Sequence, residues 1–425
     1  MTRKLTAVII GAGDRGQTYA RQMCAMPDHF QIVAVAEPKE SRRNAIRDMF
    51  SIPEDRCFHN WEDLLSLGKI ADIAVIATMD RLHFLPACAA IRAHYDILLE
   101  KPVSPDPREC EKMAQLAEAE GVKVLVCHVL RYTPFFTSIK KLIANGDLGD
   151  IISINHEECV ENIHQSHSFV RGNWGNSQRS SFMLLQKSCH DLDILQWLIG
   201  KPCKKIQSFG ALTHFVSNNA PEGAPERCID NCPHQDTCAY NAVTLYLKST
   251  SLWRRSACTG LVAPTDEDVE QALRTNQYGK CVYKCDNDVV DHQTVNMLFD
   301  GNTTATFTMC AFNKGGRFIH IMGTKGELWG SMDSQELPLR VFNFETRKTT
   351  EYPVSGKDGL VNGHGGGDQG IIKALHAHLC GNYEGFSVSD LRTSVDNHHL
   401  VFAAEESRLT GRVVDMAEYI ASLSK

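Results

Sequence analysis

The sequence predicts an α/β protein in which a parallel sheet covered by helices on both faces is followed by an α+β domain with a large, mostly antiparallel sheet. Two observations support this fold class. Over the first 127 residues, continuous runs of Val, Ile, Leu and Ala alternate with helical patterns, which is typical of strands buried on both faces. After residue 131 the strands become longer and carry alternating polar residues, which favours a sheet with one covered face.

The N-terminal strands are short and apolar, and helical segments follow them. They are expected at 5–10, 31–37, 71–78, 95–100 and 122–127, with the first helix at 14–26. Parallel strands need crossover connections, which are usually helices. We therefore place a first domain at 1–130 and a second at 131–425.

The second domain contains hairpin-like turns such as "DGN" and "TKG", which favour antiparallel pairing. Its strands are expected at 147–160, 204–216, 289–301, 303–313, 317–330 and 338–345, and its helices at 135–145, 181–199, 367–380 and 388–410. The segment 217–287 is too long for a simple hairpin loop. We expect an insertion there.

Composition excludes several classes of protein. The chain has 425 residues, of which 43% are hydrophobic and 22% charged, and its net charge is −7. Because no basic patch stands out, we expect no nucleic-acid partner. No apolar run reaches the ~18 residues of a membrane span. The N-terminus lacks the features of a signal peptide, so we expect a cytoplasmic protein.

A glycine motif marks a dinucleotide site in "VIIGAGDRGQ", residues 8–17. The pattern G-x-G-x-x-G directly follows a strand and opens a helix, which is the context that it requires. The first glycine permits a tight turn, the second lets the backbone approach a pyrophosphate, and the third lets helix and strand pack closely. The helix N-terminus then faces the phosphates. The loop residues expected to bind the cofactor are Gly11, Ala12, Gly13, Asp14, Arg15 and Gly16.

Glu37 ends the second expected strand. An acid at this position hydrogen-bonds the ribose hydroxyls of the adenosine and repels a 2′-phosphate. Arg42 and Arg43 lie just beyond it and would weaken that repulsion. The position of Glu37 therefore favours NAD over NADP.

A charged group interrupts the apolar run "FMLLQKSCHDLDILQWLIG", residues 182–200. On a continuous helix, Lys187, His190 and Asp191 fall on one face, at i, i+3 and i+4. A buried stripe of titratable groups is costly unless its members pair or face a polar cavity. Two interpretations stay open: a reaction site, or a structural ion pair between Lys187 and Asp191.

An ordered set of motifs resembles the Gfo/Idh/MocA oxidoreductases, such as glucose-fructose oxidoreductase and inositol dehydrogenase. The motifs are the glycine turn, "ATMDRLH" after the third strand, "EKP" after the fourth, "RYTP" after the fifth, and H-x-x-D-x-x-x-W-x-x-G at 190–200. The match covers nearly the whole chain. The resemblance implies an N-terminal Rossmann fold, a second domain with a large open-faced sheet, and NAD(P)-dependent chemistry on sugars and cyclitols.

The resemblance also implies roles for particular residues. Lys101 of "EKP" matches the family's catalytic lysine, and the bond to Pro102 is expected to be cis. Thr78, His83, Glu100 and Lys101 are expected beside the cofactor. His190 matches the histidine of the family's D-x-G-x-H, whereas Gln186 stands at the aspartate position. We expect His190 to act as general acid or base with Lys101, and Asp191 or Lys187 to set its charge.

Substrate contacts are expected from polar side chains near the cleft. The loop "HQSHSFVRGNW" and the glycine-rich segment "NGHGGGDQG" carry most of them. The expected residues are Tyr132, His164, His167, Arg171, Trp174 and His364. For the loop, a solvent-exposed polar segment is the alternative; for His364, it is a plain helix start.

Sixteen cysteines are present, and several crowd into the insertion. Four thiolates from two segments can hold Zn²⁺ tetrahedrally and stabilise an insertion that lacks its own core. The expected ligands are Cys228, Cys232, Cys238 and Cys281. Zinc is the less favoured interpretation here: free thiols are favoured, because a reducing compartment keeps cysteines reduced.

The favoured function is NAD-dependent oxidation of a hydroxyl on a sugar, sugar acid, glycoside or cyclitol. One alternative is glycoside cleavage through transient oxidation and elimination, with NAD recycled. Another is a catalytically silent NAD-binding sensor, which the presence of both Lys101 and His190 disfavours. We also expect a homodimer or homotetramer that forms through the second domain's sheet.

Overall fold

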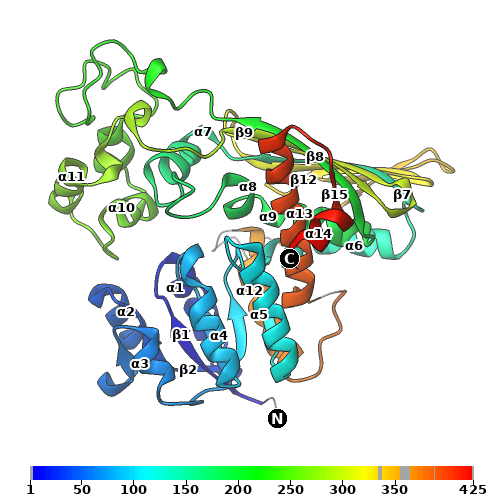
Figure 1. Cartoon of the computed structure of the whole chain (residues 1–425), viewed down its shortest axis with the longest axis horizontal. Helices are drawn as coiled ribbons and strands as arrows, with labels where there is room; N and C mark the ends of the chain where they lie inside the picture. Colours follow the sequence, from blue (N-terminus) through cyan, green and yellow to red (C-terminus); the bar gives the residue numbers. More distant parts are fainter. Residues whose placement is uncertain (1–2, 334–336, 355–363, 387, 424–425) are drawn as a thin grey trace.

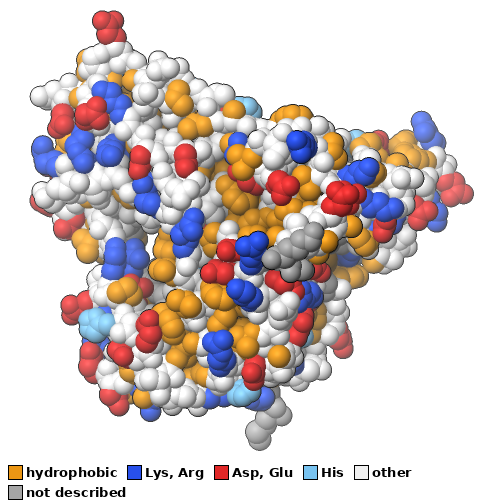
Figure 2. Space-filling model, viewed as in Figure 1, with side chains coloured by type: hydrophobic (Ala, Val, Ile, Leu, Met, Phe, Trp, Pro, Cys, Tyr) orange, Lys and Arg blue, Asp and Glu red, His pale blue; other side chains and the backbone are white. Residues whose placement is uncertain are grey.

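The computed structural model describes residues 3–333, 337–354, 364–386 and 388–423. Two sheets form the framework, and the first part of the chain lies below the larger sheet in Figure 1. Among the described residues, no helix is long and apolar enough to cross a membrane. Acidic and basic side chains are interspersed over the face shown in Figure 2.

The N-terminal sheet is parallel and six-stranded, with the order β3-β2-β1-β4-β5-β6. Its strands are β1 (Leu5–Ile10), β2 (Phe30–Ala36), β3 (Cys57–Phe58), β4 (Ile73–Ile76), β5 (Asp96–Leu99) and β6 (Val124–Val126). Its helices are α1 (Asp14–Cys24), α2 (Glu40–Phe50), α3 (Trp61–Leu65), α4 (Phe84–Arg92) and α5 (Pro107–Glu120). The strand order reverses between β1 and β4, and ligands of doubly wound sheets bind at such a point.

Local sequence explains where these helices begin and end. At the start of α5, the Asp106 side chain accepts a hydrogen bond from the N–H of Arg108, and Pro107 occupies the first turn. Both residue types are favoured at those positions. The helix ends at Gly121, whose φ of 64° lies in the left-handed region that glycine adopts without steric cost.

The second sheet has nine strands in the order β14-β13-β12-β11-β7-β10-β9-β8-β15. All neighbours pair antiparallel except β7 and β10, which are parallel. The strands are β7 (Ile151–Cys159), β8 (Cys203–Ala211), β9 (His292–Phe299), β10 (Thr304–Cys310), β11 (Gly316–Gly323), β12 (Gly326–Ser331), β13 (Leu339–Asn343), β14 (Thr349–Tyr352) and β15 (Val414–Asp415). The segment 317–330 is a hairpin of β11 and β12, and the expected turn "TKG" lies between the two strands.

Helices of the second part pack on one face of this sheet. They include α6 (Pro134–Ala144), α8 (Met183–Gln186), α9 (Cys189–Ile199), α13 (Leu391–Thr410) and α14 (Met416–Leu423). By contrast, α12 (Gly367–Leu379) packs beside α1. Its Ile371, Ile372 and Leu375 join the core formed by β1, β2 and α1, so the late part of the chain returns to the N-terminal unit.

The insertion at 217–287 has its own apolar core, contrary to our expectation. It contains the short helices α10 (Leu252–Thr259) and α11 (Asp266–Thr275), which pack against each other. The buried side chains include Ala242, Val243, Leu245, Tyr246, Val269 and Leu273. Packing of these side chains stabilises the insertion, which is the role that we expected a metal ion to have.

The predicted continuous helix at 181–199 is wrong, because it breaks at Lys187 and Ser188. In an unbroken helix the carbonyl of Gln186 would accept the N–H of His190, four residues on. Instead it accepts a hydrogen bond from Nζ of Lys101. The N–H groups of Asp191 and Leu192 both bond the carbonyl of Ser188, where the new helix starts.

Because of this break, the side chains of Lys187 and Asp191 pair with the sheet and not with each other. Lys187 Nζ lies 3.1 Å from Oε1 of Glu158 on β7. Asp191 Oδ1 accepts hydrogen bonds from His156 Nε2 and Arg317 Nε, both at 2.9 Å. Burial by itself would raise the pKa of Asp191, but Arg317 and His156 lower it to about 2.

We predict that Asp191→Asn lowers the free energy of unfolding by about 3–5 kcal/mol at pH 7, because it leaves the buried Arg317 without a full counter-charge. The folded-state pKa of Asp191 is depressed, so its contribution is present above pH ~4 and is lost as pH falls toward 2. Denaturant titrations of the two proteins should therefore converge in acid.

The control is Asp286→Asn, which removes one partner of the exposed ion pair between Arg179 and Asp286. Such pairs contribute ~0–1 kcal/mol, so this variant should unfold like the wild type. If Asp191→Asn unfolds like Asp286→Asn, the buried pair does not stabilise α9 on the sheet.

Candidate functional site

The glycine loop between β1 and α1 is shaped by close packing at two positions and by open space at the third. A Cβ on Gly11, whose φ is +88°, would lie 2.7 Å from the carbonyl oxygen of Ala77. A Cβ on Gly16 would lie 2.0 Å from the carbonyl oxygen of Gly11. A Cβ on Gly13 would meet only a guanidinium nitrogen of Arg42, at 3.8 Å. The open position fits the approach of a pyrophosphate to the backbone.

Glu37 follows β2 and is tied to this loop. Its Oε2 accepts the N–H of Ala12 at 2.8 Å, and its Oε1 accepts the N–H of Lys39 at 3.0 Å. The carboxylate is buried and thus fixed beside the loop. This position fits the ribose contact expected from the sequence. The two backbone N–H groups already fix the carboxylate before any cofactor binds.

Arg15 and Glu100 were both expected to contact the cofactor, and they bond to each other and to other side chains of the chain. Arg15 Nε lies 2.7 Å from Glu100 Oε1, and the hydroxyl of Tyr19 donates to the same oxygen at 2.7 Å. Arg15 Nη2 lies 2.6 Å from Oδ1 of Asp368 on α12. The guanidinium therefore joins the glycine loop, the end of β5 and α12.

Thr78 and His83 link two loops at the C-terminal ends of β4 and β5. One ring nitrogen of His83 lies 3.0 Å from the carbonyl oxygen of Thr78, and the other lies 2.6 Å from that of Pro102. The peptide bond between Lys101 and Pro102 is cis, as expected. These contacts fix the backbone that carries Lys101.

Lys101 and His190 meet at the junction of the two parts of the chain. Lys101 follows β5, and its amine reaches the carbonyl of Gln186, immediately before the helix break. His190 is buried. Burial, reinforced by the charge of Lys101, holds the pKa of the His190 imidazole well below its ordinary value. The ring is therefore neutral near pH 7 and able to accept a proton.

Two other expected catalytic residues lie in the ion pairs that join α9 to the sheet. Asp191 bonds His156 and Arg317, and Lys187 bonds Glu158. Neither makes a hydrogen bond or ion pair with His190 among the described contacts. The structure therefore supports a structural role for both, and the charges that bear on His190 come from other residues.

The expected substrate residues fall into two groups. His164, Trp174 and His364 lie near the junction: the His364 ring centroid is 6.1 Å from that of His190, and the carbonyl of Trp174 accepts a hydrogen bond from the Gln186 side chain at 2.7 Å. The charges of Lys187 and His364 contribute, after burial, to lowering the pKa of His164 to about 2. These three residues therefore lie close to the junction at which His190 is found.

The polar atoms of Tyr132, His167 and Arg171 bond other parts of the chain and not the junction around His190. The hydroxyl of Tyr132 bonds Ser389. A ring nitrogen of His167 lies 3.0 Å from the hydroxyl of Tyr246 in the insertion. Arg171 is buried and donates to the carbonyls of Lys280 and Tyr240. Tyr132 thus bonds the segment before α13, whereas His167 and Arg171 bond the insertion. Local sequence could not reveal these contacts.

The zinc site expected at Cys228, Cys232, Cys238 and Cys281 is not supported. Over the described ranges, no group of three or more His, Cys, Asp or Glu side chains is arranged to hold a metal ion. All four are free thiols, and Arg171 donates to the sulfur of Cys228 at 3.7 Å. A guanidinium among the thiols supplies positive charge where the metal was expected.

Sequence reasoning missed Gln186 as a backbone acceptor and Arg317, Glu158 and Asp368 as charged partners. For Arg317 and Glu158 a signal was present, since each occupies an inward position on an alternating strand. A charged residue at such a position needs a buried partner. The partner of Asp368, Arg15, is too distant in sequence to be read from spacing.

Comparison with known proteins agrees with the two-part fold. Residues 5–128 match the oxidoreductase family with an NAD-binding Rossmann fold, and residues 140–416 match the α/β C-terminal domain of the same family. The chain is 24% identical over 374 residues to YteT of Bacillus subtilis, a protein that carries the name of an oxidoreductase, and the match covers 82% of each protein.

Two shorter matches concern named enzymes. The inositol 2-dehydrogenase of Leifsonia xyli is 23% identical over 207 residues, which is 48% of this chain and 57% of that enzyme. The 2,7-anhydro-N-acetylneuraminate hydratase of Escherichia coli is 26% identical over 202 residues, 48% of this chain and 51% of that enzyme.

Among solved structures, the fold resembles the WlbA dehydrogenase of Bordetella pertussis in complex with NADH and UDP-GlcNAcA. The TM-score is 0.65 at 16% identity, and the match covers 98% of this chain and 99% of that one. Both domain models match in order and together span most of the sequence. The chain belongs to the Gfo/Idh/MocA family of NAD-binding oxidoreductases.

Proposed function

We propose that this protein oxidises a hydroxyl of a sugar, sugar acid, glycoside or cyclitol, with NAD as the hydride acceptor. One observation carries the proposal: the amine of Lys101, which follows the N-terminal sheet, bonds the backbone carbonyl of Gln186. This carbonyl lies one helical turn before His190, in the second part of the chain. A cation and a neutral imidazole at the junction of two domains are the groups that alcohol oxidation needs.

The side chains divide the chemistry between them. NAD, when bound along the glycine loop, would accept the hydride that leaves the alcohol carbon. His190, kept neutral by burial, takes the hydroxyl proton. Lys101 places a positive charge beside the oxygen as negative charge develops there. The ion pairs of Asp191 and Lys187 with the sheet keep α9 in place during the reaction.

Inositol 2-dehydrogenase, one of the relatives, bears the name of a cyclitol dehydrogenase. This similarity supports a polyol substrate for the present chain. The polar residues around the junction, His164 and His364, can donate to or accept from ring hydroxyls. A panel of polyols and sugars that includes myo-inositol, with NADH formation as the readout, tests the proposal directly.

We predict that His190→Asn lowers kcat by roughly 10²–10⁴, the usual contribution of a positioned proton-transfer group. NAD affinity and melting temperature should change little, because His190 has no ion pair in the described structure. Steady-state kinetics, calorimetry and thermal unfolding check the three quantities. The matched control is His378→Asn on α12, which should behave as wild type; normal turnover by His190→Asn would remove His190 from the mechanism.

We also predict that NAD binds more tightly than NADP, because the fixed carboxylate of Glu37 would meet a 2′-phosphate with like charge. Glu37→Ala should narrow the difference in Kd measured by calorimetry. Glu40→Ala, which removes an exposed carboxylate from the first turn of α2, should not. Equal affinity of the wild type for the two cofactors would contradict the assignment.

Glycoside cleavage through transient oxidation is a second candidate. One relative is named a hydratase and not a dehydrogenase, and two imidazoles, His190 and His364, lie near each other at the junction. Elimination needs one more proton transfer than simple oxidation. Release of nitrophenol from nitrophenyl glycosides without net NADH formation would favour this reaction, whereas stoichiometric NADH would favour simple oxidation.

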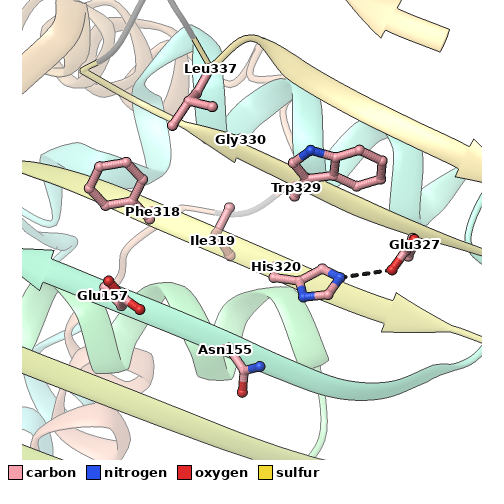
Figure 3. Close-up of a pocket in the computed structure, with 9 residues that line it drawn as sticks. All are labelled: Asn155, Glu157, Phe318, Ile319, His320, Glu327, Trp329, Gly330 and Leu337. Atoms are coloured by element: carbon pink, nitrogen blue, oxygen red, sulfur yellow. Dashed lines mark hydrogen bonds and ion pairs between the residues drawn. The ribbon is translucent and has the colours of Figure 1, made fainter. Parts of the chain in front are cut away.

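The open face of the large sheet supports self-association of the chain. A groove of about 420 Å³ lies on the face opposite His156 and Glu158 (Figure 3). It is lined by Asn155, Glu157, Phe318, Ile319, His320, Glu327, Trp329, Gly330 and Leu337. Since α9, which carries His190, packs on the other side of the sheet, we infer that this groove serves a second copy of the chain.

We predict that the wild type sediments as a dimer or tetramer and that Trp329→Asp converts it to monomers. The new carboxylate would lie beside Glu327 and remove apolar area from the groove. Leu85→Asp, at an exposed position on α4, is the control and should leave the assembly intact. A monomeric wild type in analytical ultracentrifugation would rule out the proposed interface.

A further inference from the structure

The segment His364–Gly370 is pressed tightly against the turn Val129–Tyr132, which follows β6. A Cβ on Gly367 would lie 2.3 Å from the carbonyl oxygen of Val129, and a Cβ on Gly370 would lie 2.5 Å from that of Tyr132. Only glycine permits this approach. The glycines therefore bring the start of α12 to the junction of the two parts of the chain.

Asp368, in the first turn of α12, is an ionised and anchored carboxylate. Its side chain is 2% exposed. Arg15 donates to both of its oxygens, at 2.6 and 3.3 Å. Burial opposes the charge of Asp368, but hydrogen bonds from His364 and the charge of Arg15 lower its pKa to about 2. A negative charge is thus held at this point at every pH near neutrality.

His364 lies between Asp368 and His190. Its Nδ1 is 3.4 Å from Oδ2 of Asp368, and its ring centroid is 6.1 Å from that of His190. Its backbone φ is +59°, a left-handed conformation that non-glycine residues seldom adopt. Such conformations concentrate at functional sites. Three independent features, the carboxylate, the facing imidazole and the backbone, therefore single out this side chain.

The two imidazoles differ in how well they can carry a proton. Nδ1 of His190 is buried and has no hydrogen-bond partner among the described residues, and the charge of Lys101 opposes its protonation. His364 has the carboxylate of Asp368 as a counter-charge. Burial lowers the pKa of the His364 imidazole below its ordinary value, and Asp368 raises it, while the charges of Arg15 from α1 and Arg317 from β11 lower it further. The imidazoles of His190 and His164 also face His364.

We propose that His364 is the residue that finally holds the substrate proton and that Asp368 is its positioning residue. This inference rests on the proposed function. The hydroxyl O–H bond breaks, and its proton passes through His190 to His364; the C–H bond breaks, and its electron pair leaves with hydrogen as hydride to the oxidised dinucleotide. The products are a carbonyl, the reduced dinucleotide and an imidazolium paired with Asp368. Asp368 and His364 thus form a carboxylate–histidine pair, which Gln186 cannot form with His190 because its amide does not ionise.

The first test uses kinetics of the NAD-saturated enzyme with the polyol that gives the fastest NADH formation. His364→Asn should lower kcat by roughly 10²–10⁴ with little change in NAD affinity; asparagine tolerates the left-handed backbone. Asp368→Asn should lower kcat more than KM. It should also move the acid limb of the pH profile to lower pH, because loss of the carboxylate lowers the pKa of His364. His378→Asn is the control.

The second test does not depend on turnover. Diethyl pyrocarbonate acylates neutral imidazole, and peptide mass spectrometry reports the rate at each histidine in the NAD-saturated protein. His364 should react, with the exposed His94 as internal reference, and the pH of half-maximal rate at His364 should fall in Asp368→Asn. An unreactive His364, or an unchanged half-maximal pH, would overturn the inference.

The outcomes separate the inference from the proposed function. If no polyol reduces NAD, the proposed function fails, while the acylation experiment still shows whether Asp368 controls His364. If NADH forms normally in His364→Asn, oxidation stands and the role of His364 is refuted.

Discussion

The hydrogen bond from the Lys101 amine to the carbonyl of Gln186 is the contact on which the arrangement of the junction depends. It takes the acceptor that would continue α8 into α9, so the helix restarts at Ser188. The restart turns Lys187 and Asp191 toward the sheet, where each finds a counter-charge. This contact between the two parts of the chain thus lies at the break from which α9 and His190 take their position.

Two guanidinium groups, each between two carboxylates, stabilise this arrangement. Arg15 lies between Glu100 and Asp368, and Arg317 lies between Glu158 and Asp191. Each joins segments that are far apart in sequence. A buried charge is tolerated only with such partners, and loss of one partner leaves the other uncompensated. The two clusters therefore restrain the junction from opposite sides, Arg15 from the cofactor loop and Arg317 from the large sheet.

Features that depend on neighbouring residues could be predicted from the sequence. Predictions failed where contacts between distant segments determine the structure. The glycine loop, Lys101 and His190 carry their signal in adjacent residues, and the structure places them around one junction. The continuous helix was wrong, and at its break the carbonyl of Gln186 bonds a lysine 85 residues earlier, which spacing within the helix cannot show. The zinc expectation counted cysteines, but could not show that Arg171, from another segment, lies among the thiols.

Gln186 stands where the family resemblance led us to expect an aspartate, and its contacts show what an amide does at this position. A carboxylate accepts hydrogen bonds but cannot donate one. The amide side chain instead donates to the carbonyl of Trp174 at 2.7 Å, which leaves the backbone carbonyl as the partner of Lys101. The negative charge that a proton-accepting imidazole requires is then available from Asp368 on α12, which Arg15 holds in place whatever residue stands at position 186.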